Sequence, residues 1–183
     1  MNTKKLLAGA ALVTLSAGLA PSQAMAVKGT GNISAIVVQP ITISAVNTMK
    51  FGSFSVTTTG KIPLDTAGVV AGRTGSTPIG GTIQSGSFKI SGDPRLMDVS
   101  VDTSATIKNT DTVAGGVMSV TGINFACNTA NFTVKVTGVA TGQCDLNATK
   151  TTGKITTGGT LNYTSGQTAG TYTGTYNIFV SYN

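Results

Sequence analysis

The last fourteen residues of the chain alternate between two kinds of side chain, and this pattern restricts the fold more than any other. Most odd-numbered positions from 171 to 181 carry threonine, asparagine or serine, and Phe179 is the exception. Because successive side chains of a strand point to opposite faces, the alternation predicts a strand with one buried face. We expect residues 170–183, beginning at Gly170, to form an integral strand at the edge of a sheet. The even-numbered positions of this stretch carry Tyr172, Gly174, Tyr176, Ile178, Val180 and Tyr182.

Shorter alternating segments, separated by glycine-rich turns, occupy the rest of the chain. None beyond residue 26 has the spacing of an amphipathic helix. Residues 57–86 are expected to be mainly loop, with weak strands at residues 61–64 and 82–84. Short strands at regular spacing predict an all-β protein, an immunoglobulin-like antiparallel β-sandwich. Strands are expected at residues 33–38, 41–45, 49–56, 87–91, 97–102, 117–123 and 132–136, with two short ones on either side of Gly158 and Gly159.

The first 26 residues have the organisation of a secretory signal peptide. Lys4 and Lys5 precede an apolar run over residues 6–20, and residues 24–26 read Ala-Met-Ala, a typical cleavage site. A transmembrane anchor is the alternative, but the apolar run is shorter than the roughly 20 residues that a span needs. We expect cleavage after residue 26, an N-terminal strand over residues 27–39 and one β-sandwich domain over residues 40–183.

The composition argues against catalysis and against nucleic-acid binding. The chain has no histidine, and all six acidic residues are aspartates, so serine–histidine and cysteine–histidine nucleophiles are excluded. The only carboxylates close in sequence, Asp98 and Asp102, lie on the polar side of one predicted strand. The 12 lysines and arginines are scattered along the chain and form no basic run. We therefore expect no enzyme activity, cofactor, metal site, small-molecule substrate or nucleic-acid partner.

Cys127 and Cys144, the two cysteines of the chain, are expected to form one disulfide. Paired cysteines in an exported protein usually form a disulfide. Closing this loop is worth about 3 kcal/mol in the chain-entropy model. Two free thiols or a metal-binding pair are the alternatives, and the second is disfavoured because no histidine accompanies the cysteines.

Three segments together resemble an exported bacterial family, domain of unknown function 4402. They are residues 36–54, a proline-led strand ending near Phe51-Gly52; residues 87–101, a strand, a glycine turn and a strand; and residues 158–183. The family name implies no activity.

The layout is also similar to subunits of chaperone–usher pili, especially the archaic spore-coat-U type. Pilins carry a glycine fourteenth from the end and a penultimate aromatic residue, where this chain has Gly170 and Tyr182. The chain departs from the spore-coat-U pattern in two ways. It has Pro40 where that pattern has a cysteine, and both of its cysteines lie late in the sequence.

The resemblance implies a mechanism of assembly. A pilin is a sandwich that lacks one strand, which a periplasmic chaperone supplies first and the N-terminal strand of the next subunit then replaces. Residues 27–39 would be the donor strand and would insert Ile33, Ala35 and Val37. The expected partners are further copies or other pilus subunits, with a chaperone and an usher, and the protein would pass through the periplasm to the cell surface. The acceptor groove would be edged by the final strand, with Tyr172, Tyr176, Ile178, Val180 and Tyr182 facing inward.

A second hypothesis concerns the same N-terminal segment. Residues 33–38 could fold back as the chain's own strand and complete the sandwich. The protein would then be a self-complete surface module, such as a coat, matrix or sugar-binding adhesive domain. The two hypotheses differ in whether residues 27–39 pair within the chain or between subunits.

Overall fold

The computed structural model describes residues 28–111, 116–127, 130–134, 136–146 and 148–183. The predicted signal peptide, residues 1–26, lies outside the described residues. The chain divides into two units, residues 1–36 and residues 37–183, and each is described by itself. Within the first unit, residues 28–36 form no strand. The described part of the chain contains no helix long and apolar enough to cross a membrane.

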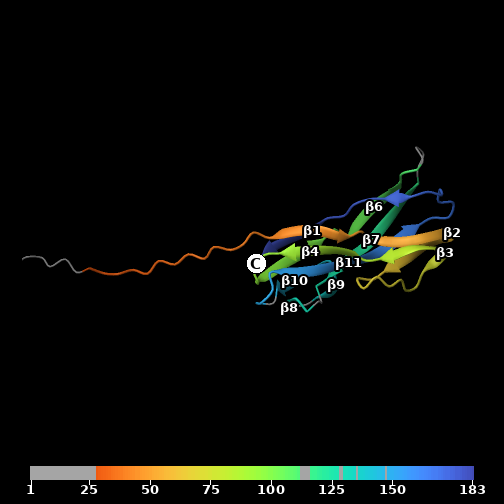
Figure 1. Ribbon diagram of the computed structural model, residues 1–183. Coiled ribbons are helices and arrows are strands. Elements are labelled where there is room, and N and C mark those ends of the chain that lie inside the picture. The colour runs from red at the N-terminus through yellow and green to blue at the C-terminus, as the bar shows by residue number, and fades with distance from the viewer. Residues whose placement is uncertain (1–27, 112–115, 128–129, 135, 147) are drawn as a thin grey trace, which may run out of the picture. The chain divides into compact units, whose positions relative to one another are not determined.

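The second unit contains two antiparallel sheets (Figure 1). The larger sheet has the strand order β1–β4–β11–β7–β6–β12; in addition, β2 pairs with β11 and β3, and β9 pairs with β7. Its strands are β1 (Thr42–Asn47), β2 (Lys50–Leu64), β3 (Thr74–Gln84), β4 (Gly86–Ser91), β6 (Ser104–Asn109), β7 (Val117–Ala126), β9 (Thr137–Val139), β11 (Thr152–Tyr163) and β12 (Tyr172–Thr173).

The smaller sheet has the order β13–β5–β10–β8. The inner strand β5 shows the alternation expected of a strand with one buried face. Met97, Val99 and Val101 are buried, whereas the residues between them are not. The predicted all-β, antiparallel sandwich is therefore confirmed. The strands of this sheet are β5 (Leu96–Val101), β8 (Phe132–Val134), β10 (Thr141–Leu146) and β13 (Ile178–Tyr182).

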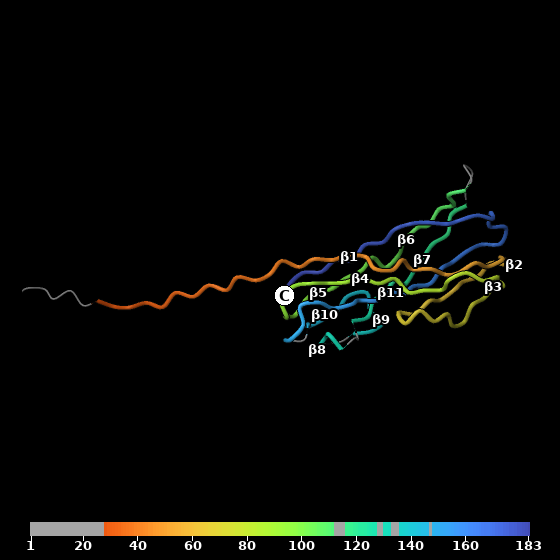
Figure 2. The backbone as a smooth tube through the Cα atoms, viewed as in Figure 1, coloured from red at the N-terminus to blue at the C-terminus, as the bar shows by residue number. Residues whose placement is uncertain are grey.

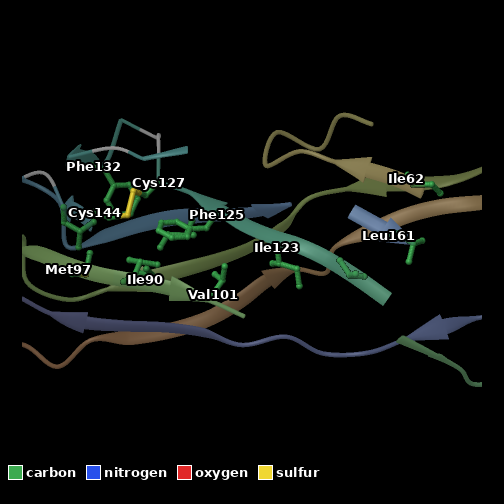
Figure 3. Close-up of a cluster of buried hydrophobic side chains, with 14 of the residues drawn as sticks. Ile62, Ile90, Met97, Val101, Ile123, Phe125, Cys127, Phe132, Cys144 and Leu161 are labelled. Carbon is green, nitrogen blue, oxygen red and sulfur yellow. A yellow bond between two sulfur atoms is a disulfide. The ribbon is translucent and has the colours of Figure 1, made fainter. Parts of the chain in front are cut away.

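The core lies between the two sheets (Figure 3). Ile90 and Phe125 come from the larger sheet and Met97 from the smaller, and all three side chains are fully buried. Each such side chain stabilises the fold by about 1.5–3 kcal/mol. A disulfide joins Cys127, just after β7, to Cys144 on β10, with the two Cα atoms 6.2 Å apart. The predicted disulfide is confirmed, and it ties the two sheets together.

The predicted C-terminal strand is two short strands that belong to different sheets. The C-terminal segment is the dark blue end of the tube in Figure 2. β12 pairs with β6 in the larger sheet, and β13 pairs with β5 in the smaller one. The chain crosses between the sheets at residues 174–177, beside the point where β5 leads into β6. There the Asp102 carboxylate accepts hydrogen bonds from the backbone N–H and the side-chain amide of Asn177, at 2.8 and 2.9 Å. The C-terminal segment therefore runs antiparallel to the consecutive strands β5 and β6. It pairs first with β6 in the larger sheet and then with β5 in the smaller one.

Residues 57–86, expected to be mainly loop, instead form most of the hairpin of β2 and β3. The weak strands predicted at residues 61–64 and 82–84 lie within β2 and β3, which are both much longer. The pairing register of this hairpin shifts at three places, including the stretch between Val56 and Lys61. A β-bulge interrupts the alternation of side chains, which hides the strands from a pattern search. Gly75 has a φ of +70° and packs against the carbonyl groups of Thr58 and Thr59, where a side chain would not fit.

The expectation of two short strands around Gly158 and Gly159 is also wrong. β11 continues through both glycines without a break. A Cβ atom on Gly158 would overlap the backbone at Leu64 and Asp65, at the end of β2. The glycine therefore allows two backbones to approach closely, which is another common use of glycine within a strand.

Candidate functional site

β1 and β13 are the end strands of the two sheets, and they border one opening. Within the described residues, β1 pairs only with β4, and β13 pairs only with β5. At one end of the opening, Gln39 just before β1 contacts Tyr182 at the end of β13. At the other end, Thr48 and Met49 after β1 line a cavity together with residues 174–176 before β13. The two strands therefore run in opposite directions along the opening, which we call the β1–β13 opening.

The side chains that point inward from these two strands are only partly covered. Ile178, Val180 and Tyr182 of β13 pack against the core but remain half-buried. On β1, Ile43 lies opposite Ile90, yet Ile43 is 39% exposed while Ile90 is fully buried. The main-chain groups on the outer side of an end strand also lack ladder partners. The opening thus combines uncovered apolar side chains with two hydrogen-bonding backbone edges.

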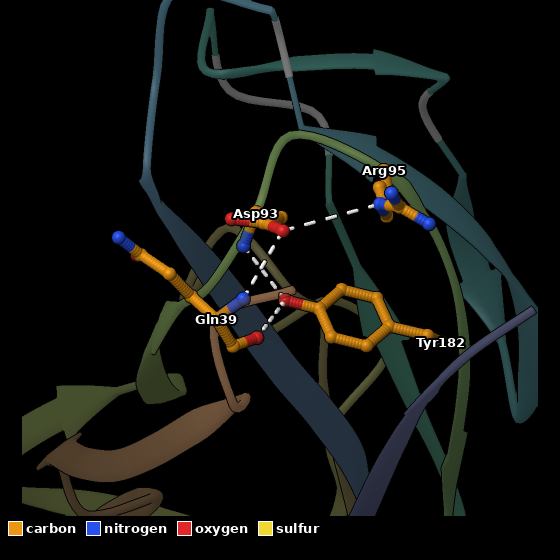
Figure 4. A network of polar contacts seen from close by, with 4 residues as sticks. All are labelled: Gln39, Asp93, Arg95 and Tyr182. Atoms are coloured by element: carbon orange, nitrogen blue, oxygen red, sulfur yellow. Dashed lines mark hydrogen bonds and ion pairs between the residues drawn. The ribbon is translucent and has the colours of Figure 1, made fainter. Parts of the chain in front are cut away.

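Tyr182 closes one end of the β1–β13 opening (Figure 4). Its hydroxyl donates to the Gln39 carbonyl at 2.8 Å and accepts from the Asp93 N–H at 2.7 Å. The Asp93 carboxylate accepts the Gln39 N–H at 3.1 Å and lies 4.0 Å from the Arg95 guanidinium. Gly92 leaves room for this arrangement, because a Cβ atom there would overlap the tyrosine hydroxyl. Both backbone polar groups of Gln39 are therefore held.

Tyr176 closes the other end of the opening, where a cavity of about 60 Å³ lies. Its ring packs edge-to-face on Phe88 with centroids 5.9 Å apart, and its hydroxyl lies 2.6 Å from Oγ1 of the buried Thr157. Burial raises the pKa of the Tyr176 hydroxyl above its ordinary value, and the hydrogen bond with Thr157 opposes the rise. Gly86 makes room for the hydroxyl, because a Cβ atom at that position would overlap it.

The residues predicted for the C-terminal pairing strand fall into two groups. Gly170 and Tyr172 do not border the opening, because Tyr172 pairs with Asn109 in the larger sheet. Gly170 packs against the side chain of Asn109, where a Cβ atom would overlap it. The residues that do border the opening are Tyr176, Ile178, Val180 and Tyr182.

The strand predicted at residues 33–38 is not formed in this chain. Residues 28–41 contain no strand, and Ala35 is exposed. The side chains of Ile33, Ile36 and Val37 are 98%, 80% and 94% exposed. An alternating apolar segment needs a neighbouring edge to satisfy its backbone and to cover its side chains. These residues have neither within the described chain, which explains the difference from the prediction.

Sequence reasoning missed Gln39, Asp93 and Thr157 as parts of this site. The only local signal was the Gly-Asp-Pro turn that contains Asp93. The contacts of Gln39 join residues 54 and 143 positions apart. A local pattern does not show such contacts.

The chemistry of the site is that of backbone pairing and apolar burial. The part of the chain that the structure describes holds no group of three or more histidine, cysteine, aspartate or glutamate residues that could bind a metal ion. Asp98 and Asp102 each bind an amide side chain, that of Gln143 for Asp98 and that of Asn177 for Asp102.

One comparison with known proteins gives a match. The family model described as "Domain of unknown function (DUF4402)" matches residues 41–182, which spans β1 to β13. No curated protein and no solved structure gives a match.

Proposed function

The chain belongs to the DUF4402 family, and we propose that it is a non-enzymatic structural protein of the cell surface. In this proposal it is a pilus-like subunit that assembles by β-strand complementation. The β1–β13 opening of one copy accepts residues 27–39 of another copy as an additional strand. The observation that carries the proposal is the pair of end strands with half-buried apolar side chains, in a chain that also has an unpaired, exposed apolar segment.

The two surfaces suit each other chemically. β-strand addition takes its affinity from main-chain hydrogen bonds and its specificity from alternate side chains that enter pockets. Residues 33–37 offer Ile33, Ala35 and Val37 on one side of an extended chain. The opening offers the outer backbone edge of β13 and the partly covered side chains of Ile43 and Val180. Covering them would gain about 25 cal/mol for each Å² of apolar surface removed from water.

The geometry around Gln39 favours pairing between copies over pairing within one chain. β1 leads from this end of the opening toward the cavity. A segment before Gln39 that entered the opening of its own chain would therefore have to reverse direction at this end. Gln39 is held at both its N–H and its carbonyl, and a residue before proline is restricted to extended conformations.

Export and an escort fit this proposal. Before assembly, the open strand edges would be an aggregation hazard. A periplasmic chaperone would cover these edges until an usher at the outer membrane joins the subunit to the next one. The Cys127–Cys144 disulfide agrees with an oxidising compartment. We propose passage through the periplasm and final residence at the cell surface, with further copies or other pilus subunits as partners.

The test compares two proteins made in the periplasm, residues 27–183 and residues 40–183. The longer protein is expected to give a ladder of multimers on gels loaded without heating, which heating reduces to one band. The shorter protein is expected to fold and to give no ladder, since residues 28–41 contain no strand. A strictly monomeric, fully folded longer protein would contradict the proposal. Failure of the shorter protein to fold would favour the self-complete module instead.

A further inference from the structure

The outer face of the smaller sheet carries a depression of about 390 Å³ that strand pairing does not use. Its position follows from the register of three adjacent strands. Residues that pair across β10, β5 and β13 form two neighbouring rows on this face. The first row is Gln143, Asp98 and Ser181, and the second is Thr141, Ser100 and Phe179. The side chains of Ser100 and Thr141 are small, so the middle of the depression is not filled.

Phe179 forms a wall of this depression on β13. It is the residue that interrupts the polar side of the C-terminal alternation, and its ring is 58% exposed. Single exposed apolar residues are common on protein surfaces. This one lines a hollow whose other side chains are largely hydroxyl, amide and carboxylate groups. An exposed ring of this kind offers an apolar face next to polar groups.

The polar wall of the depression is ordered. The Gln143 amide donates a hydrogen bond to Oδ1 of Asp98 at 2.9 Å. That bond leaves Oδ2 of Asp98 and the Gln143 carbonyl oxygen as acceptors, because a carboxylate and an amide each have more acceptor sites than one bond uses. Hydroxyl groups of Ser100, Thr141 and Ser181 add donors and acceptors along the same hollow.

We propose that this depression is a binding site for a neutral sugar, with a pyranose ring stacked on Phe179 and its hydroxyl groups bound by Asp98 and Gln143. A pyranose has a face of C–H groups and an edge of hydroxyl groups, which match the ring and the polar wall. The lining contains one carboxylate and no cationic side chain, so an anionic ligand such as a phosphate is disfavoured. A binding pocket with an apolar surface and a few placed polar groups is the usual arrangement for small ligands.

Glycoside hydrolysis needs two carboxyl groups about 5–9.5 Å apart, on either side of the bond that is cleaved. The lining of the depression contains one carboxylate, that of Asp98. The depression is therefore suited to binding a sugar, and its lining lacks the second carboxyl group that cleavage needs.

The test measures saturation transfer by NMR from the full chain, purified after export, to small sugars. The probes are the methyl β-glycosides of glucose, galactose and N-acetylglucosamine, with the acyclic polyol sorbitol as a control that lacks a pyranose face. Irradiation of aromatic protons is expected to transfer to ring C–H protons of at least one glycoside and not to sorbitol. The Phe179→Ala and Asp98→Asn variants are expected to lose at least fivefold of the signal.

Ile79→Ala is the matched control, because Ile79 is also exposed but lies on β3 of the other sheet. Its signal is expected to equal that of the wild type. No transfer to any glycoside, or equal transfer with Phe179→Ala, would overturn the proposal. This result is independent of assembly, since multimer ladders are scored separately: loss of ladders with retained sugar binding overturns only strand complementation.

Discussion

Five residues of β13 at the C-terminal end pair in register with β5, from Ile178 opposite Val101 to Tyr182 opposite Met97. Residues 33–38, near the other end of the described chain, have a comparable run of aliphatic side chains but no partner strand. Both segments have the composition of a strand, and only the first is one. The difference shows that alternation gives a segment the capacity to form a strand, whereas a neighbouring edge decides whether it does.

A second difference lies in how the two segments are held. Tyr176 and Tyr182 fix β13 by hydroxyl groups that bond outside their own sheet pairing, to Thr157, Gln39 and Asp93. No such contact holds the side chains of residues 33–37 within the described chain, where the large ones are at least 80% exposed. If residues 27–39 serve as a donor, this absence of internal contacts is what makes them available to another copy.

The largest expected effect is a loss of stability when Tyr176, which anchors the chain just before β13, is replaced. Tyr176→Ala removes a ring packed on Phe88 and leaves the buried Thr157 hydroxyl without this partner. We expect the free energy of unfolding to fall by about 3 kcal/mol, measured by urea denaturation of residues 40–183. Phe179→Ala, which removes a neighbouring but outward-facing ring, is the control and should change stability by about 0.5 kcal/mol or less. Equal losses in the two variants would mean that Tyr176 does not anchor the strand.

A valine-to-serine substitution in each segment, at Val180 in β13 and at Val37 in the N-terminal segment, tests the same difference. Val180→Ser removes a half-buried side chain from β13, and we expect it to lower the free energy of unfolding by about 1–2 kcal/mol. Val37→Ser changes a side chain that is 94% exposed, so the sandwich should keep its stability within about 0.5 kcal/mol. Its effect should appear as fewer multimers on unheated gels of residues 27–183. A Val37→Ser variant that unfolds more easily yet still forms ladders would reverse the comparison.

The smallest expected effect is confined to alkaline pH. The pKa of the Tyr176 hydroxyl is raised by burial, so the folded state holds this proton more tightly than the unfolded state does. The resulting stability is complete below the unfolded pKa near 10 and is lost as pH rises through the folded pKa. Urea denaturation between pH 8 and 11 should show a shallower loss of stability in Tyr176→Phe than in the wild type. Parallel curves would show that Tyr176 does not contribute to the alkaline dependence.

The sequence predicted the fold class, the disulfide and the β13 strand, because each depends on local side-chain patterns or on a single pair of cysteines. It failed where glycines and bulges interrupt the alternation, as in β2 and β3, and where Gly158 serves a close approach inside β11. It placed residues 170–183 in one strand because alternation does not show when a strand passes from one sheet to another. The closure of the opening by Tyr182 and Gln39 depends on long-range contacts, which the sequence pattern did not contain.

The central claim is that residues 27–39 of one copy add a strand beside β13 of another. The most direct test is amide hydrogen exchange, followed by NMR, in residues 40–183 with and without a synthetic peptide of residues 27–39. We expect the β13 amides that face away from β5 to exchange slowly only when the peptide is present. A scrambled peptide of the same composition should have no effect. Unchanged exchange at β13 with saturating peptide would contradict strand complementation.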